Sequence, residues 1–282
     1  MCVRPWGVRT RVLYVTDLSY QAQGRRYCYE DIRLSDSLRT YFDIALCHPV
    51  DAAALMGAFD AVVVRNSGPV LRYQKEYDAF RQQAVNEGVK VFSELTGKAD
   101  MLGKQYLLDL FAAGYPVIPT VDARSDLSRL PAVDHYVLKP KKGADSVGFR
   151  VLSADELHGI ELNDDLVQPL IQFPYEVSFY FIDRIFQYAL YAPNPEKRWA
   201  LDTYEPGTAD LAFAQHFVDW NDLEHGIQRV DACRTTTGDL LLVELEDLNP
   251  YLSLDRVDTQ TRQRFIRQLA ASIQQLAATE PV

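Results

Sequence analysis

The chain has 282 residues, of which 48% are hydrophobic and 24% charged, a composition typical of a folded globular protein of two or three subdomains. Its 29 basic and 39 acidic residues give a net charge of −10, which disfavours a nucleic-acid partner, since such a protein needs a basic face. No apolar run reaches the roughly 20 residues of a membrane-spanning helix, and the N-terminus has no signal-peptide pattern, so we expect a cytoplasmic protein without a membrane partner.

The first third of the chain predicts an open parallel α/β sheet, because short β-branched runs alternate with helical spacing. The expected strands are residues 12–16, 41–47, 61–64 and 89–92. Helices are expected in the second half of 20–39, at 52–56 and at 73–87, where Gly88 suits the position after a helix end. The four cysteines lie far apart without metal-ligand spacing, which indicates reduced thiols.

After a helix expected at residues 99–113, the pattern changes to antiparallel strands joined by tight turns. The expected strands are 136–139, 149–152, 166–167, 177–182, 185–192, 228–234 and 240–245, and a helix at 259–278 closes the chain. The fold class is therefore α/β followed by α+β.

A basic loop follows one of these strands, in the sequence VLKPKKGADSVGF at residues 137–149. Phosphates bind to positive charge together with closely approaching backbone N–H groups, which a glycine-containing loop supplies. The candidates are Lys139, Lys141, Gly143, Ser146 and Gly148. By itself the pattern fits a phosphate-binding loop and a solvated basic hairpin tip equally well.

A second group of polar residues occupies the last predicted hairpin, residues 229–254. Glu244 and Glu246 are two residues apart and therefore point to one face of their strand, which Asp231 on the neighbouring strand can reach. With Asn249, these oxygen ligands suit Mg²⁺ held jointly with substrate phosphates. The alternative is an acidic, solvated strand end.

A third segment, residues 166–182, is an apolar strand interrupted by Pro169, with Glu176 at the start of the next strand. The proline leaves backbone groups free, as recognition of a purine edge requires. Proline-broken strands are common, so this pattern adds weight only in combination.

The order of these features resembles that of the ATP-grasp superfamily, in the branch of glutathione synthetase, ribosomal-protein glutamate ligase and D-alanine–D-alanine ligase. The resemblance covers residues 60–255 and rests on Lys104, Lys139, Gln168, Glu176, Arg229-x-Asp231, Glu244, Glu246 and Asn249-Pro250. It implies an N-terminal substrate domain at 1–98 and an ATP-grasp fold of two α+β subdomains, a lid at 99–165 and a C-terminal part at 166–282.

The resemblance also implies roles for individual residues, with ATP and Mg²⁺ as cofactors. Lys104 and Lys139 would hold the α- and β-phosphates, and the loop 143–148 would close over the γ-phosphate. The adenine edge would be recognised by Gln168 and the backbone of Leu170 and Ile171, the ribose by Glu176, and Mg²⁺ by Asp231, Glu244, Glu246 and Asn249. Arg229 would face the acyl-phosphate.

Two departures from the family pattern leave questions open. The family ends its last strand with Glu-x-Asn, where this chain has Glu244-Leu-Glu246-Asp-Leu-Asn249, so either Glu246 replaces the asparagine or Asn249 is shifted. Residues 191–227 match the glutathione synthetase loop poorly, and Arg198 is the candidate for its arginine.

We therefore expect an ADP-forming ligase that joins a carboxylate to an amine through an acyl-phosphate, acting on amino acids or short peptides. Arg25, Arg65 and Tyr73 are the candidate substrate residues, because ligands bind at strand ends in open α/β sheets. The alternatives are a ligase for a peptide or protein side chain, a small-molecule kinase on the same ATP site, and a degenerate nucleotide-binding or interaction protein without catalysis. Whether the chain forms a homo-oligomer is left open. The five histidines are expected to be surface or loop residues.

Overall fold

The computed structural model describes residues 9–19, 21–22, 25–66, 73–142, 148–194, 197 and 200–279. The chain divides into two compact units. The first unit comprises Met1–Thr96, Leu223–Ile227 and Leu248–Val282, and the second comprises Gly97–Asp222 and Gln228–Asp247. The three subdomain boundaries expected from the sequence stay a prediction, and the C-terminal helix belongs to the first unit.

The first unit is built on a four-stranded parallel sheet of order β4-β1-β5-β6. Its strands are β1 (Arg11–Thr16), β4 (Asp43–Cys47), β5 (Ala61–Asn66) and β6 (Val91–Phe92). The central strands β1 and β5 are almost continuously apolar and buried, as expected for parallel strands covered on both faces. The predicted open parallel sheet is confirmed.

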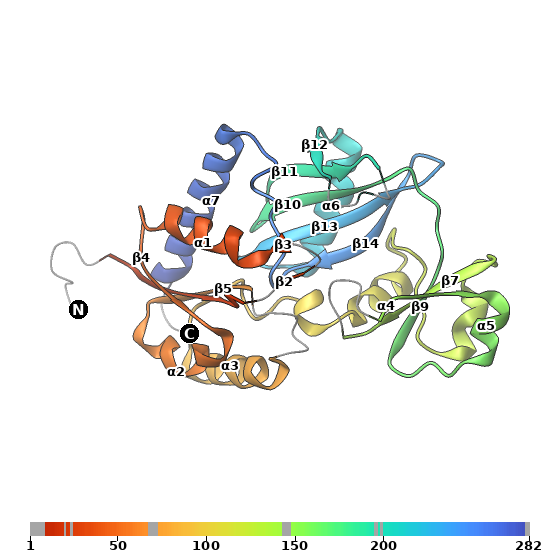
Figure 1. Ribbon diagram of the computed structural model, residues 1–282, viewed down its shortest axis with the longest axis horizontal. Coiled ribbons are helices and arrows are strands. Elements are labelled where there is room, and N and C mark those ends of the chain that lie inside the picture. Colours follow the sequence, from red (N-terminus) through yellow and green to blue (C-terminus); the bar gives the residue numbers. More distant parts are fainter. Residues whose placement is uncertain are drawn as a thin grey trace. The chain divides into compact units, whose positions relative to one another are not determined.

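Helices cover both faces of this sheet (Figure 1). α1 (Tyr27–Leu38) and α7 (Thr259–Ala278) lie on one face, and α2 (Ala52–Leu55) and α3 (Gln74–Glu87) on the other. α3 ends at Gly88, whose φ of 63° is the left-handed conformation that glycine adopts without strain. Short elements complete the unit: β2 (Gln21–Ala22), β3 (Arg25–Arg26), and the 3₁₀ helices η1 (Pro49–Asp51) and η2 (Met56–Ala58).

The second unit contains a five-stranded sheet of order β12-β11-β10-β13-β14. Its strands are β10 (Tyr175–Ile182), β11 (Ile185–Ala192), β12 (Asp202–Tyr204), β13 (Ile227–Arg234) and β14 (Leu240–Glu246). One face packs against α4 (Gln105–Ala112) and α6 (Thr208–Asn221) in a core that includes Phe179, Phe217 and Leu242. On β13 and β14 the opposite face carries charged residues, with Arg229 paired to Glu246 and Asp231 to Glu244.

The second unit also contains a three-stranded antiparallel sheet of order β8-β7-β9. It is formed by β7 (His135–Pro140), β8 (Arg150–Ser153) and β9 (Asp165–Pro169). A small separate core lies between this sheet and α5 (Ala154–Gly159), which begins with a capping box formed by Ser153 and Glu156. The 3₁₀ helix η4 (Arg124–Arg129) precedes β7.

The continuous helix predicted for residues 99–113 is wrong. A 3₁₀ turn, η3 (Asp100–Leu102), is followed by Gly103 with a φ of 90°, and α4 begins only at Gln105. Lys104 is therefore the residue before the helix and not part of it. The cause is tertiary, since Asp247 accepts hydrogen bonds from the Ala99 and Met101 N–H groups and holds them out of a helical path.

Two further observations apply to the described part of the chain. None of its helices has the length and apolar character needed to cross a bilayer. Cys28, Cys47 and Cys233 are free thiols.

Candidate functional site

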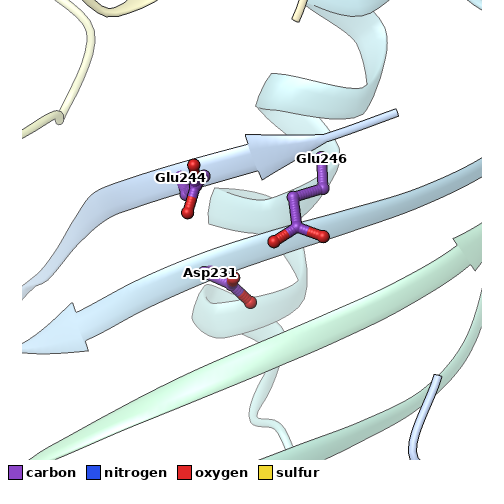
Figure 2. Close-up of side chains that lie close together, drawn as sticks. All are labelled: Asp231, Glu244 and Glu246. Carbon is purple, nitrogen blue, oxygen red and sulfur yellow. The ribbon is translucent and has the colours of Figure 1, made fainter. Parts of the chain in front are cut away.

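Three carboxylates meet on one face of the five-stranded sheet (Figure 2). β13 and β14 pair so that Asp231 lies opposite Glu244, and Arg229 lies opposite Glu246. Because side chains alternate along a strand, these residues share the face opposite the core. Asp231, Glu244 and Glu246 each offer an oxygen within 4.8 Å of the others, as a divalent cation would require.

The Arg229 guanidinium lies between two of these carboxylates. Its Nε and Nη2 donate to the two oxygens of Asp231 at 2.9 and 2.7 Å, and Nη2 also contacts Glu246. Ser178 Oγ on β10 donates to Asp231 at 2.6 Å. Asp231 is thus held in a fixed orientation by a bidentate ion pair and a hydroxyl. Ser178 was not predicted, although its spacing of two from Glu176 places both on this face.

Lys104 joins this group through an ion pair in which its Nζ lies 2.9 Å from Glu244 Oε1. Burial alone would lower the pKa of Lys104, but the carboxyl groups of Glu244, Asp100 and Glu246 together outweigh burial and raise it. Burial would likewise raise the pKa of Glu244, yet the positive charges of Lys104, Lys139 and Arg229 lower it to about 2. Glu244 is therefore an ionised carboxylate at neutral pH.

Glu246 has the opposite electrostatic balance. Burial raises its pKa to about 8, and the neighbouring carboxylates of Asp231 and Glu244 add to this effect. Arg229, which contacts Glu246 directly, opposes the shift, but burial and the two neighbouring carboxylates together outweigh it. The two glutamates of one strand thus differ in charge state because only Glu244 has a lysine of its own.

Lys139 on β7 and Glu176 on β10 both act electrostatically on residues of β13 and β14. The Lys139 charge contributes to lowering the pKa of Glu244, so its ammonium group is within electrostatic range of the carboxylates. Burial raises the pKa of Cys233 to about 11, while Glu176 adds to the shift and Lys139 opposes it. The structure therefore joins three predicted positions that are remote in the sequence, Lys104, Asp231 and Glu244, in one group, and Lys139 adds its charge from β7.

The basic loop after β7 is described only at its ends. Gly143 and Ser146 lie outside the described residues, whereas Gly148 has a φ of 80° and a Cβ there would lie 2.7 Å from Pro140 Cγ. The Lys141 side chain does not join the carboxylate group, because its Nζ pairs with Asp122 at 2.7 Å. Its carbonyl accepts the Lys104 N–H at 2.9 Å, so this residue fixes the backbone of the other lysine.

The predicted adenine-reading residues are engaged within the protein. Gln168 is buried, and its Nε2 donates to Thr120 Oγ1 at 2.8 Å. The Leu170 N–H donates to the His135 carbonyl at 3.0 Å, so it is not free to read a base, while Ile171 is half-buried. Val151 on β8 was not predicted as a site residue. It pairs with Val137, which shares one face of the three-stranded sheet with Lys139, and its side chain is 46% exposed.

Arg65 lies inside the first unit and is only 4% exposed. Its Nε pairs with Asp31 at 3.3 Å, its Nη2 lies 3.7 Å from Glu30, and Nη2 donates to the Pro250 carbonyl at 2.9 Å. A substrate carboxylate would have to displace these partners. Asn249 belongs to this unit and not to that of the three carboxylates.

Tyr73 also lies in the first unit, at the start of α3. Its hydroxyl donates to Asp17 at 3.1 Å and lies 3.2 Å from His48 Nε2. His48 therefore has specific partners that its sequence context did not indicate. The Arg25 side chain and the whole of Arg198 lie outside the described residues.

A parallel α/β unit together with a three-stranded and a five-stranded antiparallel sheet defines the ATP-grasp fold, and the chain has this fold. It resembles D-cycloserine synthetase DcsG with a TM-score of 0.72 and 23% identity, over 93% of this chain and 99% of the other.

The D-alanine–D-alanine ligase from Bacillus anthracis, complexed with ATP, matches with a TM-score of 0.68 and 12% identity, over 95% of this chain and 97% of the other. The ATP-grasp ligase PsnB, complexed with a minimal precursor, matches with a TM-score of 0.66 and 16% identity, over 94% and 99%. No model of a known protein family and no curated protein sequence matches the chain.

Proposed function

We propose that the protein is an ADP-forming ligase that uses Mg²⁺ and ATP to join a carboxylate to an amine through an acyl-phosphate. The observation that carries the proposal is the meeting of Lys104 and Arg229 with three carboxylates on one face of the five-stranded sheet, to which Lys139 on β7 adds its charge. The ATP-grasp fold and the ligases that share it support the same conclusion.

The donor set fits a magnesium ion. Asp231, Glu244 and Glu246 offer only carboxylate oxygens, the ligand type that Mg²⁺ prefers together with substrate phosphates. Glu246 takes the place of the family's asparagine, and the pairing of Arg229 with Glu246 favours it over Asn249 as the third ligand. When bound, Mg²⁺ would neutralise negative charge on the transferring phosphoryl group.

The basic residues would serve the phosphates. Lys104 and Lys139 would supply the positive charge that opposes the α- and β-phosphates, and Gly148 would end the loop proposed to close over the γ-phosphate. Arg229 would stabilise charge on the acyl-phosphate and on the tetrahedral intermediate that follows. Its contacts with Asp231 and Glu246 keep the guanidinium in place before the substrate binds, which lowers the cost of reorganisation during the reaction.

The nucleoside would lie against the three-stranded sheet. Val151 offers an exposed apolar surface beside Lys139, and the Leu170 and Ile171 carbonyls are the backbone groups proposed to meet the adenine edge. Glu176 is proposed to hold the ribose hydroxyls. Gln168 would contribute to the adenine site indirectly, through the hydrogen bond that its side chain donates to Thr120.

The carboxylate and amine are proposed to be amino acids or short peptides. The ligases of the same fold are named for D-alanine and D-cycloserine, or are complexed with a precursor peptide, and these are properties of those proteins. Tyr73, Arg25 and Arg65 of the first unit remain the proposed substrate residues. Arg65 would bind a substrate carboxylate only after it releases its present carboxylate and carbonyl partners.

The test is a screen of amino-acid pairs and short peptides for ATP-dependent phosphate release, with mass detection of the product. The proposal predicts ADP, phosphate and a condensed product that has lost one water. A phosphorylated small molecule without free phosphate would identify a kinase instead, and nucleotide binding without turnover on any pair would leave only a binding protein.

A further inference from the structure

Asp247, the residue directly after β14, has a completely buried carboxylate. Its Oδ2 accepts the Ala99 N–H and Asn221 Nδ2, both at 3.1 Å, and its Oδ1 accepts the Met101 N–H at 3.0 Å. In return, the Asp247 N–H donates to Asp100 Oδ1 at 2.6 Å. Each carboxylate oxygen therefore meets an N–H group that is fixed by the backbone, an arrangement that holds a carboxylate strongly.

The segment that begins at Gly97 is shaped around this carboxylate. A Cβ at position 97 would lie 2.3 Å from Asp247 Oδ2, a distance at which something must move. Asn221 extends the arrangement, because its Oδ1 accepts the Lys98 N–H at 2.7 Å while its Nδ2 donates to Asp247. The segment thus fits closely on Asp247.

This segment leads directly to Lys104. Only Leu102 and Gly103 separate Met101 from it, and Gly103 has a fixed φ of 90°. The Lys104 backbone is held at its other side by the Lys141 carbonyl, and its Nζ reaches Glu244 Oε1 at 2.9 Å. Asp247 is at the same time peptide-bonded to Glu246. One carboxylate therefore fixes the metal-ligand strand against the turn that supplies the phosphate-binding lysine.

We propose that Asp247 is a positioning residue that sets where the Lys104 ammonium lies relative to Glu244 and Glu246, an inference that rests on the proposed function of the site. Asp247 itself touches neither metal nor nucleotide in this role. In the stretch Glu244-Leu-Glu246-Asp247, the two glutamates would then bind the cation. Asp247, the next residue, would anchor the turn that carries Lys104.

The test uses Asp247→Asn, which keeps the shape but presents an N–H₂ group to N–H donors. We expect the affinity for Mg·ADP, measured by calorimetry and therefore without turnover, to fall about 10- to 100-fold, as for other residues that orient ligands. In a Lys104→Met background the same substitution should change the affinity less than about threefold, because the lysine it positions is already gone.

Glu30→Gln is the matched control. Glu30 is also a buried carboxylate that accepts two backbone N–H groups, from Leu252 at 2.7 Å and Leu254 at 3.2 Å, but in the first unit. It should leave the Mg·ADP affinity of folded protein unchanged. An equal loss for Asp247→Asn with and without Lys104, or no loss at all, would overturn the inference.

A second variant, Gly97→Ala, and hydrogen exchange test the same anchor independently. If Asp247→Asn does not fold, Gly97→Ala displaces the carboxylate while keeping every hydrogen-bonding group, and its loss of affinity should also depend on Lys104. Hydrogen exchange of the Ala99 and Met101 amides should be slow in the wild type and faster in Asp247→Asn. Unchanged exchange would refute the anchor even if the wild type bound no nucleotide, an outcome that would separately refute the proposed function.

Discussion

Glu246→Gln should stabilise the protein at alkaline pH, although it removes a proposed metal ligand. Burial beside Asp231 and Glu244 raises the pKa of Glu246 to about 8, from an ordinary 4.5. Between these values the folded protein keeps a proton that the unfolded chain has released, so the free energy of unfolding falls as pH rises through this window. Glutamine has the same shape and never ionises, so the free energy of unfolding of the variant should not fall in this way as pH rises.

The size of the effect follows from the shift. A rise from 4.5 to about 8 corresponds to an upper limit of ~5 kcal/mol at pH 9, since each pKa unit is worth ~1.4 kcal/mol. We expect ~1–3 kcal/mol, because the side chain is 18% exposed and water reduces the repulsion between the carboxylates. For a protein of this size that is ~2–4 °C in Tm for each kcal/mol. At pH 5 the two proteins should be about equally stable.

The assay is urea or thermal unfolding from pH 5 to 9, with and without MgCl₂. Mg²⁺ should restore the stability of the wild type at pH 9 more than that of Glu246→Gln, because the ion neutralises the third carboxylate. Equal Mg²⁺ stabilisation of both proteins would remove Glu246 from the metal site. A wild-type stability that stays level or rises between pH 5 and 8 would refute the electrostatic reasoning.

Glu244→Gln is the control with the opposite sign. The pKa of Glu244 is lowered to about 2, so its stabilising contribution is present above 4.5 and is lost as pH falls from 4.5 towards 2. Its replacement leaves the half-buried Lys104 without its carboxylate, which should cost ~1–3 kcal/mol at neutral pH.

Three further predictions concern other parts of the chain. Lys139→Ala should abolish ATP turnover with an unchanged Tm, whereas Lys98→Ala, which removes an exposed lysine bonded to a carbonyl, should leave phosphate release as it is. Arg65→Met should destabilise the protein by ~3–5 kcal/mol in urea unfolding, because Asp31 is left buried without its cation, and a loss below 1 kcal/mol would argue against the buried ion pair. Gly148→Ala should cost ~1–3 kcal/mol, since alanine at a φ of 80° is strained and its Cβ meets Pro140, and an unchanged Tm would contradict this.

Several elements were predictable because local pattern alone decides them. The helix at 259–278 has the bounds expected from the sequence, since its apolar residues keep a helical period and Asp258 caps it. Glu244 and Glu246 share a face because strand side chains alternate with a period of two. By contrast, Gly103 and the distant Asp247 interrupted an otherwise helical pattern at 99–113.

The sequence by itself determined the order of the strands along the chain, the parallel first sheet, and the residue types of the proposed cation and phosphate site. Only the tertiary structure decided which of these residues meet. The pairing register places Glu246 opposite Arg229 and Glu244 opposite Asp231, and an ion pair joins Lys104 to Glu244 across 140 positions of the chain. Such choices depend on long-range packing and burial, which also give the two glutamates opposite pKa shifts, and no local spacing encodes them.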